Sequence, residues 1–541
     1  MPNVIGEPRE RQTRCRRDAT TDTVCRAGDA PQAPRTMSSP APVSPVPIET
    51  EAVVPAHPQL FGHPRPLYTL FFTELWERFS YYGMRALLTF YMVAPLAKGG
   101  MGLPDNKAAL VYGTYTMSVY MLSIPGGMMA DNILGSRLAV LIGGIIIAAG
   151  HFSMAMPGDF TFYLGLVLIV LGTGLLKPNI SAMVGQLYRP GDPRRDAGFS
   201  IFYMGINLGA FIAPLATGFL AQHSKFKEVL TGWGFNPVHS WHWGFAAAGV
   251  GMVLGLIVFL VFGGGLKEVG PPPARVPGAW RKPLLTLVGT LALWGVVKLS
   301  DTAGFTWIRY LFILVPVALM VWFGFSRQEE VRRLGAIFFF FIGAFVFWAL
   351  FEQAGSSLSL FADRFTATHV GGVEVPAAWY QAANPIFVIV LAPVFALIWT
   401  RLGASQPSSP MKFTLGLFFL ALGFSLMIPA ARLAAEGRVS PLWLLGLYLL
   451  QTMGEMCLSP VGLSTFTKLA PRHLVGAMLG IWFLGAAFGN KFAGVLAASF
   501  GEGEAGHLDR FFGQQALAVF IVAGVFLALV PWVRRRMGGV L

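Results

Sequence analysis

The chain has 541 residues, of which 54% belong to the apolar set AVILMFWYC and only 12% are charged. Soluble domains carry roughly 25% charged residues, so this composition excludes a soluble enzyme, a secreted disulfide scaffold and a disordered protein. The net charge of +13 would suggest a nucleic-acid partner in a soluble protein, but in a membrane protein basic loop residues set the topology. We therefore expect a polytopic membrane protein with no nucleic-acid partner.

The predicted elements begin after a polar tail. Residues 1–66 are rich in Pro, Ala, Thr and Arg and lack long apolar runs, which is typical of a disordered segment. From Leu67 onward, apolar stretches long enough to cross a hydrocarbon core of about 30 Å alternate with short polar breaks. We count about fourteen such stretches, centred near Leu88, Tyr120, Ile145, Leu168, Gly209, Met252, Leu291, Val315, Phe345, Val390, Phe419, Leu450, Ile481 and Ala523.

The loops between these stretches predict an orientation. With both termini inside, the inner loops hold about eighteen Lys and Arg residues and the outer loops about eight. Because basic residues concentrate on the cytoplasmic side, we expect both termini in the cytoplasm and a multi-pass protein of the cell membrane, in a bacterium the inner membrane.

A long polar break, Lys267 to Lys282, contains three consecutive prolines and divides six spans from eight. If the spans near Leu291 and Val315 are an insertion, the remainder is six plus six, an arrangement of two helical bundles with a substrate path between them. We therefore expect an all-α fold with one bundle over 67–265, a linker and two inserted helices over 266–334, and a second bundle over 335–536.

The first span carries an unusual set of polar side chains. Steps of three and four residues place them on one helical face: Glu74, Glu77, Arg78, Tyr81, Tyr82 and Arg85. Each ionisable group costs at least about 2.5 to 3.5 kcal/mol at mid-bilayer, so a lipid-facing stripe is excluded. An internal ion-pair ladder is one interpretation, and one wall of a polar cavity is the other.

Other spans supply polar partners for this stripe. Lys177, Glu352 and Glu455 lie in three separate apolar runs, which favours a shared aqueous site. Asn207 and Asn384 are either part of that site or interhelical hydrogen-bonding groups.

Three further features of the spans bear on packing and movement. Tyr120 is an aromatic residue of the kind that usually packs between helices, and Asp131, beside a short basic turn, is expected to cap the next helix or lock the bundles as a conformational element. Pro178, Pro385 and Pro460 each stand beside or near a polar residue and are expected to remove a backbone hydrogen bond there.

Several motifs are missing from the sequence. It contains no GxxxxGK[ST], HExxH or GxSxG pattern, and its three cysteines show no metal-ligand spacing. We therefore expect no enzyme activity, no cofactor and no metal. The energy source is then an ion gradient, and the titratable glutamates make the proton the natural coupling ion.

At these residues the chain resembles the proton-dependent oligopeptide transporter family of the major facilitator superfamily. Glu74-x-x-Glu77-Arg78-Phe79 resembles the ExxERF motif of the family's first helix, and GGMMAD and FYMGINLGAF resemble its two signatures. GTGLLKPN, FWALFEQ, GEMCLSPVG and a Trp-Phe-Leu run at Trp482 follow in the expected order, so the resemblance covers about residues 67 to 536. The two extra helices are typical of bacterial members.

The resemblance implies a proton-coupled symporter of di- and tripeptides that works by alternating access, and it gives roles to the site residues. Residues matching Arg78 and Lys177 hold the peptide carboxylate in relatives, and those matching Asn207, Asn384 and Glu455 face its amino group. Residues expected to contact the rest of the substrate are Tyr81, Tyr82, Tyr120 and Trp482. The expected protonation sites are Glu74, Glu77 and Glu352, with Arg85 as the ion-pair partner of Glu352.

Two alternatives remain open at this point. The first is a proton-coupled carrier of nitrate or another small acid, and the second is a peptide sensor that binds without transporting. An acid facing an amino group, as Glu455 would, has little use for an anionic substrate. The expected partners are a small peptide, protons and the lipid bilayer, with no obligate protein partner.

Overall fold

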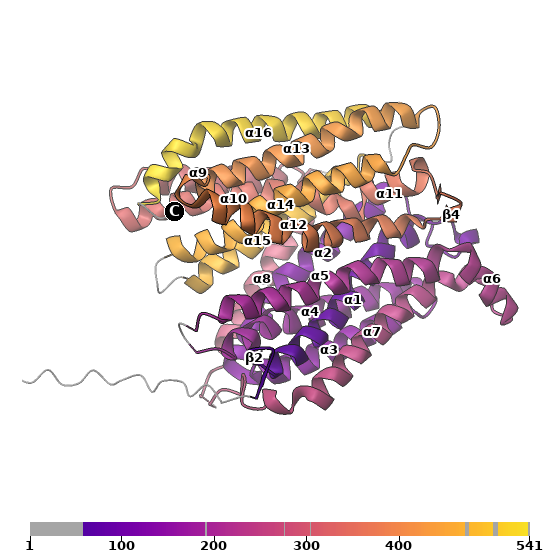
Figure 1. The fold of residues 1–541 in the computed structure, drawn as a ribbon, viewed down its shortest axis with the longest axis horizontal. Helices are drawn as coiled ribbons and strands as arrows, with labels where there is room; N and C mark the ends of the chain where they lie inside the picture. The colour runs from indigo at the N-terminus through magenta and orange to yellow at the C-terminus, as the bar shows by residue number, and fades with distance from the viewer. Residues whose placement is uncertain are drawn as a thin grey trace, which may run out of the picture. The chain divides into compact units, whose positions relative to one another are not determined.

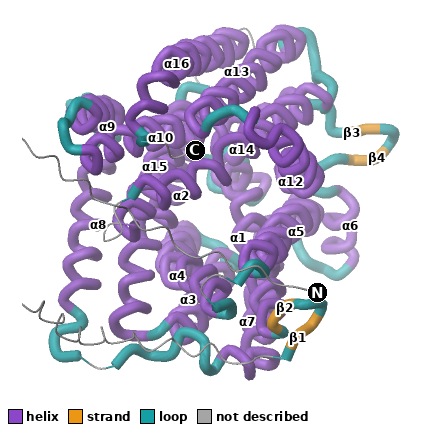
Figure 2. The backbone as a smooth tube through the Cα atoms, turned by 60° about the vertical axis from the view of Figure 1, so that its left-hand side comes forward, coloured by secondary structure: helices purple, strands orange, loops and turns teal. Residues whose placement is uncertain are grey.

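The computed structural model describes residues 58–189, 192–274, 276–302, 304–470, 475–500 and 507–538. Nearly all of this part of the chain is helical, and its strands are confined to two short antiparallel hairpins, β1 (Gln59–Leu60) with β2 (His63–Pro64) and β3 (His369–Val370) with β4 (Val373–Glu374) (Figure 2). Helices dominate because a backbone in hydrocarbon has to satisfy its own hydrogen bonds.

The first bundle contains six long helices and one short one (Figure 1). Its members are α1 (Pro66–Val93), α2 (Asp105–Met129), α3 (Ser136–Met154), α4 (Asp159–Gln186), α5 (Arg195–Gln222), the short α6 (Ser224–Gly232) and α7 (Ser240–Phe262). A proline at the start of α1 suits a position whose N–H has no helical acceptor. A π-helical turn, η2 (Ala130–Leu134), follows α2 directly.

The second bundle begins at α10 (Figure 1). Its members are α10 (Glu329–Phe351), η5 (Glu352–Gly355), α11 (Ser357–Phe365), η6 (Ala377–Ala382), α12 (Ala383–Leu402), α13 (Ser409–Ala434), α14 (Leu442–Leu469), α15 (Val475–Ala497) and α16 (Leu508–Arg536). Each of the fourteen predicted span centres falls inside a different helix, so the predicted number of spans is confirmed.

Ten stretches of the described chain are long and apolar enough to cross a membrane, and Ile308–Gly324 is a shorter apolar helix. Three further helices, α1, α2 and α14, have 28, 25 and 28 residues and therefore also have the length of a span. Two of them contain ionisable residues of the predicted site, Glu74 to Arg85 in α1 and Glu455 in α14. The protein is a multi-pass membrane protein.

Of the predicted tail, residues 1–66, the part from residue 1 to residue 57 lies outside the described residues. Its last part differs from the expectation, because Gln59 to Pro64 form the β1–β2 hairpin and Pro66 opens α1. His63 Nδ1 lies 2.9 Å from the hydroxyl of Tyr188, a contact that the local sequence does not reveal.

The prolines lie where the expectation puts them. Pro385 is the third residue of α12, and η6 runs directly into this helix. Pro385 therefore has no N–H to offer the carbonyls of the preceding helical turn. Pro178 and Pro460 lie inside helices, and α4 and α14 continue through them.

The inserted helices α8 (Arg281–Leu299) and α9 (Ile308–Gly324) bridge the two bundles. In α8, the indole N–H of Trp294 donates to Ser118 Oγ of α2 at 2.9 Å. In α9, the ring of Phe312 stacks on Phe488 of α15, with 4.9 Å between the ring centroids. Helix α8 thus contacts the first bundle, and α9 contacts the second.

The turn after α8 ends in a buried polar junction. Asp301 Oδ2 lies 2.7 Å from the ammonium of Lys491 in α15, whose side chain is only 1% exposed. The same ammonium donates to Thr114 Oγ1 of α2 at 3.0 Å. Lys491 therefore joins both bundles and the inserted pair at one point.

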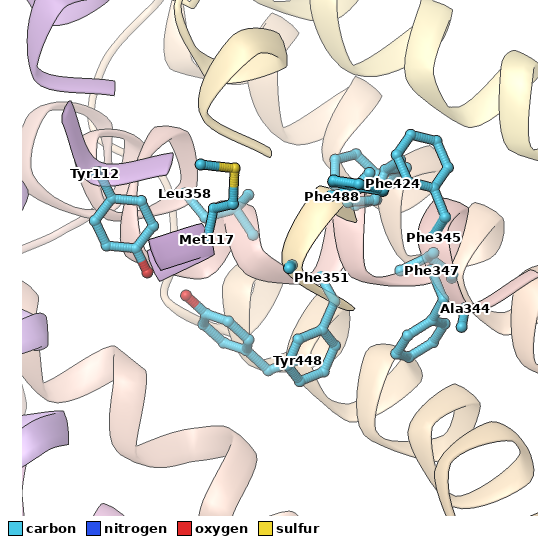
Figure 3. Packing of buried hydrophobic residues seen from close by; sticks show 14 of the residues in the cluster. Tyr112, Met117, Ala344, Phe345, Phe347, Phe351, Leu358, Phe424, Tyr448 and Phe488 are labelled. Carbon is cyan, nitrogen blue, oxygen red and sulfur yellow. The ribbon is translucent and has the colours of Figure 1, made fainter. Parts of the chain in front are cut away.

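Apolar packing also crosses between the bundles. Helices α2 and α15 meet at glycines, since a Cβ atom on Gly113 would lie 2.9 Å from the Cα of Gly494. One buried cluster contains Tyr112 of α2 together with Phe347 and Phe351 of α10 and with side chains of α14 (Figure 3).

Loss of the Asp301 carboxylate should destabilise the protein. In Asp301→Ala, the buried ammonium of Lys491 loses its counter-ion, a change worth about 3 kcal/mol for buried pairs. We expect the apparent melting temperature in detergent to fall by roughly 5 °C. Asp192→Ala, which removes an exposed pair with Arg194, is the matched control. An equal effect of the two substitutions would contradict a structural role for the junction.

Candidate functional site

A cavity of about 290 Å³ lies between the two bundles. Its lining comes from α1, α2, α4 and α5 on one side and from α10, η5, η6, α12 and α14 on the other. The predicted site residues in its wall are Glu74, Arg78, Tyr82, Arg85, Tyr120, Lys177, Asn207, Glu352, Asn384 and Glu455. Ten of the thirteen side chains predicted to bind substrate or protons therefore meet in one place, although they come from distant parts of the sequence.

The polar stripe of α1 forms a compact ionic cluster. Arg78 Nε lies 2.8 Å from Glu74 Oε1 and 2.5 Å from Glu77 Oε2, and the three side chains are at most 4% exposed. Among the described residues, Glu74 Oε2 and Arg78 Nη2 have no hydrogen-bond partner. The cluster is thus both the predicted ion-pair ladder and part of a cavity wall, and it retains a free donor and a free acceptor.

Lys177 approaches the same wall from α4. Its ammonium lies 3.9 Å above the ring centroid of Tyr120 on α2, a cation–π contact. Tyr120 is therefore more than a packing residue, because it holds the cation that is predicted to bind a carboxylate. Arg78 and Lys177 are two of the three cationic side chains in this wall, and Arg85 is the third.

A second ion pair connects the bundles. Arg85 of α1 contacts Glu352 of η5 through Nη2 and Oε2, and Arg85 Nε donates to the hydroxyl of Tyr112 at 2.6 Å. The side chains of Arg85 and Glu352 are 9% and 4% exposed. One turn further along α1, Thr89 Oγ1 donates to the carbonyl of Gly355 at 2.6 Å. The ion pair expected from the family resemblance is present.

The opposite wall carries an acidic group held by an amide. Asn384 Nδ2 donates to Glu455 Oε2 and to Thr452 Oγ1, each at 3.0 Å. Glu455 is 8% exposed, and within the described residues no cation lies within ion-pair distance of it. This carboxyl group therefore faces the cavity without a counter-ion of its own.

Polar contacts between the bundles gather at the end where α1 finishes and α2 begins. The guanidinium of Arg364 contacts both oxygens of Asp105 at 2.6 and 2.7 Å. The indole of Trp379 donates to the carbonyl of Leu215 at 3.0 Å. Ser224 Oγ donates to Glu374 at 2.5 Å, and Gln381 Nε2 donates to the carbonyl of Ala86 at 3.3 Å. These contacts close that end of the cavity.

Four predicted residues lie outside the cavity wall. Glu77 stands behind it and contacts Arg78. Tyr81 is buried against Tyr82, with 5.2 Å between ring centroids. Trp482 packs inside the second bundle, 5.2 Å from the ring centroid of Phe466.

Asp131, the fourth, does not cap the next helix, so the first of its two predicted roles is wrong, whereas locking of the bundles stays a prediction. It is an exposed residue of the π-helical turn η2, and Gly135 occupies the N-cap position of α3 without a side-chain hydrogen bond. Asp131 lies four residues before that N-cap, inside the π-helical turn, and therefore too far from the start of α3 to cap it.

The structure adds polar groups that the sequence analysis missed. Gln451 and Ser459 line the cavity one helical turn before and after Glu455, and Trp348 and Tyr448 line it nearby. In the described residues, the amide of Gln451, the hydroxyl of Ser459 and the indole N–H of Trp348 have no hydrogen-bond partner. The spacing of four residues about Glu455 is the signal that could have identified Gln451 and Ser459.

The arrangement suits a small zwitterion. Cationic groups stand on the first bundle and an uncompensated carboxyl group on the second, where unpaired neutral donors and acceptors also lie. Hydrogen bonds to charged groups are roughly twice as strong as neutral ones, so two opposed poles select both charge and orientation. The volume is at the small end of the range for ligand pockets.

Comparison with known proteins decides the family. The profile described as the POT family matches residues 137–509. The chain belongs to the POT family. A peptide transporter of Yersinia enterocolitica, YePEPT, is 39% identical over 517 residues, covering 91% of this chain and 98% of its own. The di-/tripeptide transporter of Lactococcus lactis subsp. cremoris is 36% identical, covering 89% of this chain and 98% of its own.

Solved structures agree with this assignment. A variant of the peptide transporter POT in complex with alafosfalin superposes with a TM-score of 0.78 at 40% identity, covering 90% of this chain and 99% of that one. A POT family transporter in complex with 5-aminolevulinic acid gives a TM-score of 0.76 at 32% identity, with coverage of 89% and 99%. As a POT family member, this chain is a secondary transporter with the major facilitator fold.

Removal of the Glu352 carboxylate should loosen the closed end of this POT transporter. In Glu352→Ala, the buried Arg85 loses its counter-ion, and we expect the ratio of open to closed populations to rise roughly tenfold, the change that about 1.4 kcal/mol produces. Electron-resonance distances between spin labels at exposed Lys107 and Val370 report that ratio. Arg432→Ala removes an exposed pair within the second bundle and should leave the distances unchanged. Identical distance distributions for both variants would contradict a role of the Arg85–Glu352 pair in holding this end closed.

Proposed function

We propose that this POT family member is a proton-coupled symporter that imports di- and tripeptides by alternating access. The observation that supports this most directly is the opposition of Arg78 and Lys177 on one wall to Glu455 on the other. A short peptide presents a carboxylate at one end and an ammonium at the other, so it satisfies both walls at once. The names of the relatives, which include peptide and di-/tripeptide transporters, agree with this substrate class.

The substrate carboxylate binds the free guanidinium nitrogen of Arg78 and the ammonium of Lys177, while the substrate ammonium binds Glu455. Asn384 orients the Glu455 carboxyl group through its 3.0 Å hydrogen bond. Asn207 stands in the same wall, and its amide donates to the carbonyl of Tyr203 at 3.0 Å, so its oxygen remains available to the substrate ammonium. The side chains of the peptide lie against Tyr82 and Trp348.

The driving force in this proposal is the proton gradient, with no cofactor. A proton on Glu352 neutralises the partner of Arg85 and separates η5 from α1, which opens the closed end. A proton on Glu74 or Glu77 weakens the ion pair of that carboxyl group with Arg78, so that the guanidinium can bind the substrate. Loss of these protons to the cytoplasm after peptide release restores both ion pairs and resets the cavity.

The direction of transport follows from a proposed orientation. Both termini lie in the cytoplasm, in a bacterium on the inner side of the inner membrane, because about eighteen basic loop residues fall on that side and about eight on the other. The closed end, with Asp105 and Arg364, then faces outward. The structure therefore corresponds to the outward-closed state of the cycle.

Glu352→Gln should separate coupling from binding. The amide keeps the size of the carboxyl group but cannot take up a proton, so we expect concentrative uptake of a labelled dipeptide into proteoliposomes, driven by an imposed pH gradient, to be lost. Counterflow exchange without a gradient should persist within about twofold. Glu329→Gln, an exposed position, is the control and should retain both activities. Concentrative uptake by Glu352→Gln would rule out this residue as the coupling site.

The two poles can be tested with blocked peptides. Glu455→Gln should weaken binding of dialanine roughly tenfold while binding of N-acetyl-dialanine stays the same, because only the free ammonium loses its ionic partner. Lys177→Gln should weaken the binding of dialanine but not the binding of dialanine amide. Competition against a labelled dipeptide measures all four affinities. Equal losses for free and blocked peptides would contradict the assigned poles, and nitrate competing better than dialanine would favour the small-acid carrier.

Accumulation also distinguishes transport from sensing. Wild-type protein that binds dialanine with full affinity but shows neither gradient-driven uptake nor counterflow would be a sensor, and the proposed function would then be wrong.

A further inference from the structure

A second and larger cavity, of about 520 Å³, lies within the second bundle at the end opposite the closed contacts. It is bounded by the last turns of α12, the start of α13 and the last turns of α14. Within the described residues it shares no lining side chain with the central cavity. The proposed peptide site therefore does not account for it.

The charged side chains that line this cavity are all basic. Lys412 of α13, Lys468 of α14 and Arg534 of α16 line it, and no acidic side chain of the described chain does so. Lys412 is held in place, because its ammonium donates to Gln406 Oε1 at 2.7 Å and lies 4.5 Å from the ring centroid of Trp399. The residue is only 9% exposed. A fixed, largely buried cation beside two more is a built site for an anion.

The backbone adds to this preference. Helix α13 begins at Ser409, and both Ser409 and its N-cap Ser408 line the cavity. The Ser408 side chain makes no capping hydrogen bond, so it leaves first-turn N–H groups of α13 for another acceptor. A helix N-terminus attracts negative charge, and phosphate oxygens suit its N–H groups. Thr465, which is 3% exposed, contributes a hydroxyl group from α14.

The rest of the wall is largely apolar, and Phe395 and Met456 line it. Outside the cavity, on other faces of α12, Val394, Leu397 and Leu402 are 44%, 49% and 41% exposed, although α12 is a spanning helix. Side chains of this kind on a spanning helix face lipid tails, and the end of such a helix lies at the level of the headgroups.

We propose that this cavity binds the phosphate group of an anionic phospholipid, with Lys412 and Arg534 as its ligands and the acyl chains along the exposed face of α12. A free phosphate ion has the same oxygen ligands to offer, but it has no apolar part that could contact the apolar side chains of the wall. Basic pockets at the ends of spanning helices are suited to anionic headgroups for this reason. The site is independent of the peptide substrate.

Native mass spectrometry of the full chain in detergent, titrated with phosphatidylglycerol or phosphatidylcholine, tests the proposal. We expect the wild type to retain one phosphatidylglycerol roughly tenfold more tightly than phosphatidylcholine, and Lys412→Gln with Arg534→Gln to remove that preference. Arg535→Gln is the matched control, because Arg535 is exposed on the same last turn of α16 but does not line the cavity. Lys412→Arg keeps the charge and should keep the preference.

Two further measurements make each outcome decisive. Binding of dialanine to the double variant shows that its fold is intact, since neither residue lines the central cavity. Millimolar inorganic phosphate, read by thermal stability, identifies the source. If phosphate stabilises the wild type but not the double variant, and lipid preference is absent, the site takes free phosphate and the lipid assignment is wrong. A lipid preference that survives the double substitution, or falls equally in Arg535→Gln, overturns the proposal.

Discussion

The structure depends on one constraint: a charged side chain inside a membrane protein has to form an ion pair or hydrogen bonds within the protein, because hydrocarbon provides neither. Each charged group at membrane depth therefore marks a place where segments distant in sequence come together. Arg85 and Glu352 join the two bundles, and Lys491 and Asp301 join α15 to the inserted helices. Arg78 with Glu74 and Glu77 is the exception, since all three belong to α1. Among the described residues this cluster retains both an unpaired donor, Arg78 Nη2, and an unpaired acceptor, Glu74 Oε2. It therefore has groups to offer a substrate at the cavity wall.

Much of this arrangement could be predicted from the sequence, because the signals are local. Apolar length identifies the spans, and helical spacing places the polar residues of α1 on one face. The pairing of Arg85 with Glu352 follows from the family resemblance, since no local pattern relates residues so far apart. Asp131 does not cap α3, because Gly135 takes the N-cap position after a π-helical turn, a backbone feature that the motif does not reveal. Trp482 was expected at the cavity but lies against Phe466, and this depends on how α15 packs on α14.

The groups missed by the sequence analysis share a different property. Gln451 and Ser459 are uncharged, so their presence in an apolar span carries little energetic information by itself. Their importance appears only when burial and hydrogen bonding are known, because then their donors and acceptors prove to be unpaired at the cavity wall. The charged residues of the site can therefore be identified from the sequence, whereas its neutral residues are found only in the structure.

Helix α14 contributes to both cavities, with Glu455 in the central wall and Met456 in the second. The helix also contains Pro460, which leaves the carbonyl one turn earlier, at Met456, without its usual helical donor. Pro460 lines the second cavity and its neighbour Ser459 lines the central one, so the missing hydrogen bond lies where the two walls share one helix.

The closed end also has a kinetic consequence. Its contacts, from the Arg85 pair to the bidentate Arg364 pair and the hydrogen bond of Trp379, form across one interface and have to part together in every transport cycle. In the proposed cycle the rate of this step depends on breaking several contacts across one interface, so its temperature dependence should be as steep as that of an unfolding step.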